Sequence, residues 1–174
     1  WPEGIIAGIY LEDLKKFSNI FNKSFSKKHL LIFGINTQDN SSDEFYNSLI
    51  VSNNNLEVLY KYDKKKLVPF GEFIPFNDLS EKFGLKKITQ GYGSFSKGNK
   101  QKNFLFDDLN ILPLICYEII FPKLTQFSDK KTNMIVNISE DAWFGNSIGP
   151  HQHFTKAIFR SIENNTYLAR SANK

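Results

Sequence analysis

Apolar segments of strand length alternate along this chain with segments of helical periodicity, and that alternation restricts the folds open to it. The segments "HLLIFGIN" (29–36), "ILPLIC" (111–116) and "NMIVNIS" (133–139) are short apolar runs that suit buried strands. No apolar stretch approaches the ~20 residues that a membrane-spanning helix needs. We therefore expect a layered α/β fold, with sheet buried under helices.

Three segments carry the helical part of this pattern. Residues 11–21 predict an amphipathic helix, residues 77–84 a short helix, and residues 152–165 a longer one. The stripe expected on the inner face of the last helix consists of Phe154, Ala157, Ile158, Ser161 and Ile162.

A hairpin interrupts the alternation. Residues 44–51 and 56–62 flank the turn signal Asn53-Asn54-Asn55, which predicts two antiparallel strands. Residues 103–106 and 111–116 form a second pair of strands around the turn that starts at Asp107-Asp108. Hairpins and crossover helices in one chain favour a mixed sheet over a purely parallel one.

The single cysteine, Cys116, lies at the end of an apolar run and two residues before Glu118. One cysteine excludes an internal disulfide. A thiol that attacks a carbonyl carbon needs a base for its proton and a cation or donors for the developing oxyanion. His29, His151 and His153 each have an ordinary place at the start of a strand or a helix, so the sequence favours carboxylates and a lysine as its partners.

Four charged residues meet that requirement when they are taken together. Glu3 stands in "WPE", Lys64 and Glu72 in "KKKLVPFGEF", and Glu118 just after the cysteine. Any one of them alone would be a solvated surface charge. Taken together, these carboxylates and this lysine offer the cysteine a base and a cation.

The same segments resemble a known family. The chain is similar in sequence to the bacterial apolipoprotein N-acyltransferases of the nitrilase superfamily. The similar segments are "WPE", "YDKKKLVPFGEFIPF", "ICYEIIFP", "DAWFGNSIGPHQHFTKAIFRSIE" and "RSAN". The resemblance implies a nitrilase-like α-β-β-α sandwich, incomplete at both ends. Residues 1–174 would form a partial carbon–nitrogen hydrolase catalytic domain, without the flanking membrane segments of its parent.

The resemblance also implies roles for individual residues. Glu3 matches the general base, Lys64 the oxyanion-stabilising lysine and Cys116 the nucleophile. The supporting positions are Glu72, Tyr117, Glu118 and Trp143. One position departs from the family, which usually has asparagine where this chain has Glu140.

The implied reaction is a two-step acyl transfer. A phospholipid donates its acyl chain to the cysteine as a thioester, and the N-terminal diacylglyceryl-cysteine of an apolipoprotein accepts it. The resemblance implies no cofactor, no metal and no nucleic acid. It places the domain at a membrane surface, on the periplasmic face of the bacterial inner membrane.

Two other classes stay open on sequence alone. A soluble carbon–nitrogen hydrolase would use the same Glu-Lys-Cys residues with water as the second acceptor. A non-catalytic module that binds nucleic acid or a membrane surface rests only on the net charge of +4 and an aromatic content of 15%, since no binding motif accompanies them.

Overall fold

The computed structural model describes residues 1–6, 8–39, 41–75, 94–99, 102–126 and 132–173. The helical elements are α1 (Leu11–Leu14), η1 (Lys15–Phe17), α2 (Ser18–Ser24), η2 (Cys116–Ile120), α4 (Pro122–Thr125), η3 (Asp141–Phe144) and α5 (Gly149–Asn164). The strands are β1 (Leu31–Asp39), β2 (Glu44–Ser52), β3 (Val58–Asp63), β4 (Phe104–Phe106), β5 (Leu109–Ile115), β6 (Met134–Glu140) and β7 (Tyr167–Asn173).

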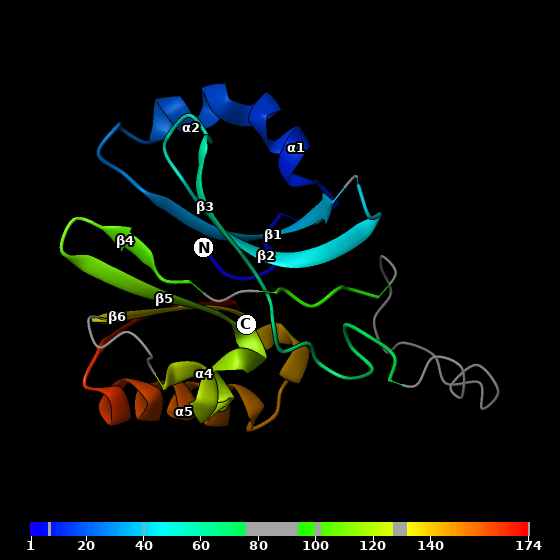
Figure 1. The fold of residues 1–174 in the computed structure, drawn as a ribbon, viewed down its shortest axis with the longest axis vertical. Coiled ribbons are helices and arrows are strands. Elements are labelled where there is room, and N and C mark those ends of the chain that lie inside the picture. The colour runs from blue at the N-terminus through cyan, green and yellow to red at the C-terminus, as the bar shows by residue number, and fades with distance from the viewer. Residues whose placement is uncertain (7, 40, 76–93, 100–101, 127–131, 174) are drawn as a thin grey trace.

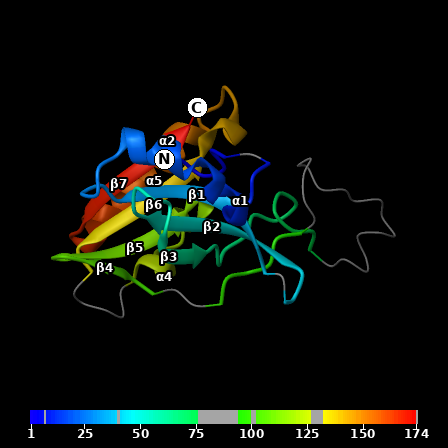
Figure 2. The same cartoon turned by 90° about the horizontal axis from the view of Figure 1, so that it is seen from above.

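Two sheets lie face to face, with helices on the outer side of each (Figure 1; Figure 2 shows the same layers from above). The first sheet has the order β1-β2-β3 and is antiparallel. The second has the order β4-β5-β6-β7, where β4 and β5 are antiparallel and β5, β6 and β7 are parallel. The predicted α-β-β-α layering and the mixed sheet are therefore confirmed.

Three apolar layers hold the sandwich together. Between the sheets, side chains such as Leu49 and Tyr62 meet Ile115 and Ile138. The outer face of the first sheet packs on α1 and α2, and the outer face of the second packs on η2 and α5. The alternation along β5 explains this double burial, because Ile111 and Ile115 face the other sheet while Leu112 and Leu114 face the helices.

The predicted hairpins are present, with differences at their ends. The first joins β2 to β3, and the second joins β4 to β5 through Asp107, which takes a positive φ of 49°. Cys116 is the first residue of η2 and not the end of a strand. Strand β7 has no counterpart among the predicted strands, because half of its residues are polar and its face does not alternate cleanly.

The helices differ more from the sequence prediction. The segment predicted as one helix over 11–21 is α1, η1 and α2 in succession, and it continues to Ser24. The helix predicted at 77–84 lies outside the described residues. No helix in the described part of the chain is long and apolar enough to cross a membrane.

The inner face predicted for the last helix is confirmed at Ala157 and wrong at Phe154, Ile158 and Ile162, while Ser161 is half-buried. The buried residues of α5 are His153, Ala157 and Arg160, whereas Phe154, Ile158 and Ile162 are exposed. The helix sits close to the sheet at its small residue, so Ala157 contacts the apolar cluster that contains Leu114 and Ile135. Apolar periodicity predicted one buried face of the helix. The observed buried face is different, because it includes the polar residues His153 and Arg160.

Substituting Ala157 by Leu tests this close packing. Three added carbons have no space at a fully buried position, so we expect the free energy of unfolding to fall by about 1–3 kcal/mol. The matched control is Lys156→Leu, which adds a leucine at the exposed neighbouring position and should change stability by no more than about 0.5 kcal/mol. Urea unfolding of both variants measures the difference, and equal losses would contradict the packing described here.

Candidate active site

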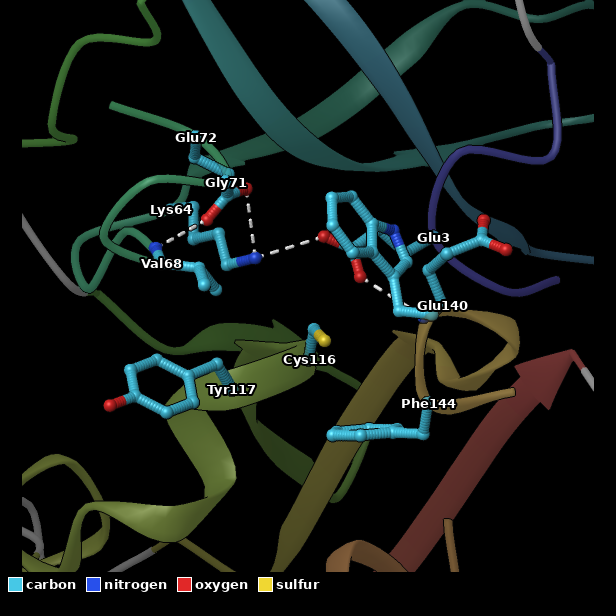
Figure 3. A pocket seen from close by; sticks show the side chains of 10 residues that line it. Glu3, Lys64, Val68, Gly71, Glu72, Cys116, Tyr117, Glu140 and Phe144 are labelled. Carbon is cyan, nitrogen blue, oxygen red and sulfur yellow. Dashed lines mark hydrogen bonds and ion pairs between the residues drawn. The ribbon is translucent and has the colours of Figure 1, made fainter. Parts of the chain in front are cut away.

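A pocket of about 260 Å³ opens where β3, β5 and β6 end. Its lining consists of Glu3, Lys64, Val68, Gly71, Glu72, Cys116, Tyr117, Glu140, Trp143 and Phe144. The structure thus brings all three predicted catalytic positions to one pocket (Figure 3). The supporting residues Glu72, Tyr117 and Trp143 line the same pocket.

Lys64 is the electrostatic centre of this pocket. Its side chain is 1% exposed, and its Nζ lies 2.9 Å from Oε1 of Glu3 and 2.9 Å from Oε1 of Glu72 (Figure 3). Burial acts to lower the pKa of Lys64, but the two carboxylates outweigh it and the pKa is raised above its ordinary value. Lys64 is therefore a permanent cation that two carboxylates hold in place.

Asn47 on β2 ties the two carboxylates together. Its Nδ2 donates to Oε1 of Glu3 at 2.6 Å and to Oε1 of Glu72 at 2.7 Å. Each of these oxygens therefore receives one bond from an ammonium and one from an amide. The remaining oxygen of Glu72 accepts from the Val68 backbone N–H at 2.8 Å, which folds the loop after β3 around the carboxylate.

Glu3 reaches the pocket because the first residues run close along β1. A Cβ at Gly34 would lie 2.7 Å from the Glu3 Cα, so only glycine permits this approach. The second oxygen of Glu3, Oε2, accepts from the Glu140 backbone N–H at 3.0 Å. Burial raises the pKa of Glu3, but the charge of Lys64 and the hydrogen bond from Asn47 outweigh it, and the pKa is lowered overall.

Cys116 stands at the turn between β5 and η2 with a φ of 48°. This left-handed conformation is uncommon outside glycine. Burial and the negative charge of Glu3 raise the pKa of the Cys116 thiol to about 12, although Lys64 and the Ser139 hydroxyl act in the opposite direction. At neutral pH the thiol is protonated and Glu3 is ionised, so a base stands beside a protonated nucleophile.

Glu118 does not line the pocket, and its carboxylate is fully buried behind it. It accepts the Tyr62 hydroxyl at 2.9 Å and the backbone N–H groups of Lys65, Lys66 and Ile115 at 2.7, 3.0 and 2.9 Å. Burial raises its pKa against the effect of these donors. Glu118 thus fastens the segment after Lys64 to the turn that carries Cys116.

The aromatic residues form the outer wall. Trp143 and Phe144 are 54% and 41% exposed, so neither is core. The Tyr117 ring packs edge-on against Phe121 at 4.9 Å, and its hydroxyl points away from the Cys116 sulfur (Figure 3). Among the residues that the structure describes, no group of three or more His, Cys, Asp or Glu side chains is arranged to hold a metal ion.

The sequence of this chain matches the carbon–nitrogen hydrolase family over residues 2–174. The chain belongs to that family. The Glu-Lys-Cys arrangement of the pocket is thus found in a carbon–nitrogen hydrolase domain.

Curated relatives of this carbon–nitrogen hydrolase domain are named apolipoprotein N-acyltransferase. The protein from Rhizobium leguminosarum bv. trifolii is 35% identical over 177 residues, which covers 99% of this chain and 33% of the relative. The protein from Bradyrhizobium diazoefficiens is 44% identical over 129 residues, 74% of this chain and 24% of the relative. The chain therefore spans about a third of the length of the first of these relatives.

Solved structures confirm the carbon–nitrogen hydrolase fold. A nitrilase-superfamily protein of Saccharomyces cerevisiae superimposes with a TM-score of 0.65 at 20% identity, covering 98% of this chain and 60% of the other. An amidase from Nesterenkonia sp. superimposes with a TM-score of 0.62 at 15% identity, covering 99% of this chain and 57% of the other.

Two residues of this site, Asn47 and His153, were not identified from the sequence. The sequence predicts only a hairpin strand around Asn47, and an amide in a strand gives no signal of a buried partner. His153 was set aside as the start of a helix, yet it is buried and its Nε2 lies 3.1 Å from the Cys116 carbonyl oxygen. The burial of His153 depends on the tertiary structure, and the sequence carries no signal for it.

Removing the cation should leave two buried carboxylates unpaired. For Lys64→Met we expect the free energy of unfolding at neutral pH to fall by about 3–5 kcal/mol. The folded pKa of Glu3 lies below its ordinary value of 4.5, so its stabilising effect is complete above that value and is lost as the pH falls through the folded pKa. The difference between the variant and the wild type should therefore shrink in acid.

Urea unfolding at neutral pH and in acid checks this prediction. Lys65→Met is the matched control, because its ammonium has neither carboxylate beside it, and it should change stability by no more than about 0.5 kcal/mol. A deficit in Lys64→Met that grows as the pH falls would be inconsistent with a buried ion pair.

Glu140 provides a second test. Its carboxylate points away from Cys116 (Figure 3), and its Oε1 accepts from the Asn173 side-chain amide at 2.5 Å. Its contact with Glu3 uses only the backbone N–H, which asparagine retains. Glu140→Asn should therefore cost about 0.5–1.5 kcal/mol of stability and leave the rate of Cys116 alkylation by iodoacetamide unchanged. A large loss of alkylation rate in a folded variant would show that the carboxylate itself acts in the site.

Proposed function

We propose that this chain is the catalytic domain of an apolipoprotein N-acyltransferase that works at the extracytoplasmic face of the bacterial inner membrane. The names of its curated relatives support the reaction class. The observation that carries the proposal is the arrangement of Glu3, Lys64 and Cys116 around one pocket with exposed aromatic walls.

In the first step Cys116 attacks the acyl ester carbonyl of a phospholipid. The thiol proton passes to Glu3 while the sulfur–carbon bond forms. This transfer is concerted with attack, since the thiol pKa of about 12 and the lowered pKa of Glu3 make a free thiolate unfavourable. Lys64 stabilises the oxyanion, a contribution commonly worth about 2.7–4 kcal/mol. The proton on Glu3 then goes to the leaving alcohol of the lysophospholipid, and the acyl chain remains on the sulfur.

In the second step the α-amino group of a diacylglyceryl-cysteine attacks the thioester carbonyl. Glu3 accepts the amine proton as the nitrogen–carbon bond forms and returns it to the sulfur as the thioester breaks. The products are an N-acylated apolipoprotein and the resting Cys116 thiol. Glu72 and Asn47 keep Lys64 and Glu3 in place during both steps.

The wall of the pocket supports an acyl substrate. The surface that lines it is predominantly apolar, and Val68, Trp143 and Phe144 are among the residues that line it. An acyl chain lodged against these residues would exclude water from the thioester carbonyl. The exposed side chains of Trp143 and Phe144, with Ile148 beyond them, also suit contact with a lipid surface.

A soluble hydrolase is the second candidate. The fold neighbours include the amidase from Nesterenkonia sp., a mutant of which shows the result of Michael addition of acrylamide at its active-site cysteine. Such an enzyme shares the first step and uses water in the second. The lifetime of the acyl-enzyme therefore separates the two functions.

The test uses the full-length protein mixed with phospholipid and no acceptor. We expect a fatty acyl adduct to accumulate on Cys116 in intact-protein mass spectrometry and neutral hydroxylamine to remove it, as a thioester requires. A peptide with an N-terminal diacylglyceryl-cysteine should then discharge the adduct into an amide. The Cys116→Ala variant is the control and should show no adduct and no turnover.

Two results would overturn the proposal. If Cys116→Ala keeps its activity, Cys116 is not the nucleophile. If no adduct accumulates while small amides are hydrolysed steadily, the soluble hydrolase replaces the acyltransferase.

A further inference from the structure

A buried polar cluster lies directly behind the nucleophile, and the two-step reaction above makes no use of it. Its members come from β6, η3, α5 and β7, and they are Asn137, Ser139, Asp141, His153 and Arg170. The side chains of His153, Asp141 and Arg170 are 4%, 7% and 6% exposed. A cluster of charged and polar groups at this depth is expensive unless its hydrogen bonds are satisfied.

The contact of His153 with Cys116 fixes one proton of the ring. Its Nε2 stands 3.1 Å from the carbonyl oxygen of Cys116. A carbonyl oxygen only accepts, so Nε2 carries a hydrogen and donates it. This bond is therefore present in either charge state of the ring.

The other ring nitrogen has two neighbours of opposite kind. Asp141 Oδ1 lies 2.9 Å from Nδ1 and only accepts, whereas Arg170 Nη2 lies 3.1 Å from it and only donates. A neutral ring accepts from Arg170 at Nδ1, and a protonated ring donates to Asp141. Arg170 Nη2 also binds both oxygens of Asp141, at 2.9 and 2.7 Å, which holds the carboxylate beside the ring.

The backbone of Cys116 needs an additional restraint. The residue follows Ile115, the last residue of β5 in register with β6, and it takes the left-handed φ of 48°. A side chain larger than glycine resists this conformation, so neighbouring contacts must hold it. The direction of the sulfur depends on the same backbone angles.

We propose that His153 is a positioning residue that holds the nucleophile by its own backbone carbonyl. The Nε2–H bond keeps Cys116 in the left-handed conformation that aims its sulfur into the pocket. Asp141 and Arg170 orient the ring. Asp141 also accepts the Ser139 hydroxyl at 2.7 Å, and Ser139 contacts the thiol, so one carboxylate steadies both the backbone and the side chain of Cys116. The inference rests on the proposed function only in taking Cys116 as the nucleophile.

Two isosteric substitutions separate this role from simple packing. In His153→Gln the amide nitrogen takes the place of Nε2 and still donates to the Cys116 carbonyl. In His153→Asn the shorter amide takes the place of Nδ1, near Asp141 and Arg170, and does not reach the carbonyl. Both variants remove the imidazole ring, so they differ mainly in the bond to Cys116.

The measurement is the rate at which iodoacetamide alkylates Cys116 in the full-length protein, read by peptide mass spectrometry beside a melting curve. We expect His153→Asn to react at least about tenfold more slowly than the wild type, the equivalent of one good hydrogen bond. His153→Gln should restore the alkylation rate to within about threefold of the wild-type rate. The melting temperatures of the two variants should not account for this difference in rate. With a short soluble ester as substrate, the loss in His153→Asn should fall on kcat more than on KM.

Three outcomes would overturn the proposal: wild-type alkylation in His153→Asn, equal slowing in both variants, or slowing that follows melting temperature alone. If His153→Asn does not fold, the glutamine variant decides, and a folded His153→Gln that reacts more than about tenfold slower than the wild type also overturns it. Alkylation requires no acyl donor or acceptor. A failed thioester test with this alkylation pattern intact would therefore reject the proposed function and keep the inference.

Discussion

The buried ammonium of Lys64 is the interaction on which the rest of the site depends. Removing a lysine from water costs several kcal/mol, and only close, well-aligned carboxylates compensate for that cost. Here Glu3 comes from the start of the chain and Glu72 from the loop after β3, and both reach Nζ at 2.9 Å. Because Asn47 on β2 bonds both carboxylates, the first sheet, the loop and the N-terminal segment must all be in place for the cation to be stable.

A second buried carboxylate sets the distance between the two halves of the site. Glu118 binds backbone N–H groups on both sides, at Lys65 and Lys66 after β3 and at Ile115 before the nucleophile. The two segments belong to different sheets, so Glu118 works as a clamp across the sandwich. The resemblance drawn from sequence assigned Glu118 a supporting part, and the structure gives that part a mechanical explanation.

The charge balance of the pocket defines its resting state. Two carboxylates surround one ammonium, so the cluster carries a net negative charge beside the thiol. This charge and burial keep the thiol protonated, while Lys64 keeps Glu3 ionised. At neutral pH a site of this kind holds little free thiolate, so attack on a carbonyl carbon proceeds as the proton leaves for Glu3.

Much of this protein was determined by its sequence alone. Short apolar runs predicted most of the strands, turn residues predicted the hairpins, and the resemblance to one family predicted that Glu3, Lys64 and Cys116 share a pocket. These features are local, or they are carried by residue types whose chemistry is recognisable without coordinates. The resemblance of whole segments to one family supplied the layering of the fold.

Only the tertiary structure decided which residues complete the site and which faces are buried. Asn47 and His153 are ordinary in sequence, and their importance comes from distant partners. Asn47 bonds carboxylates 44 and 25 residues away, and His153 bonds the Cys116 carbonyl 37 residues away. The inner face of α5 follows His153, Ala157 and Arg160 because polar contacts behind the nucleophile compete with apolar periodicity for the same side of the helix. The residue pattern of one segment reports only the hydrophobicity of that segment. The burial of a charge depends instead on groups that folding brings from elsewhere in the chain.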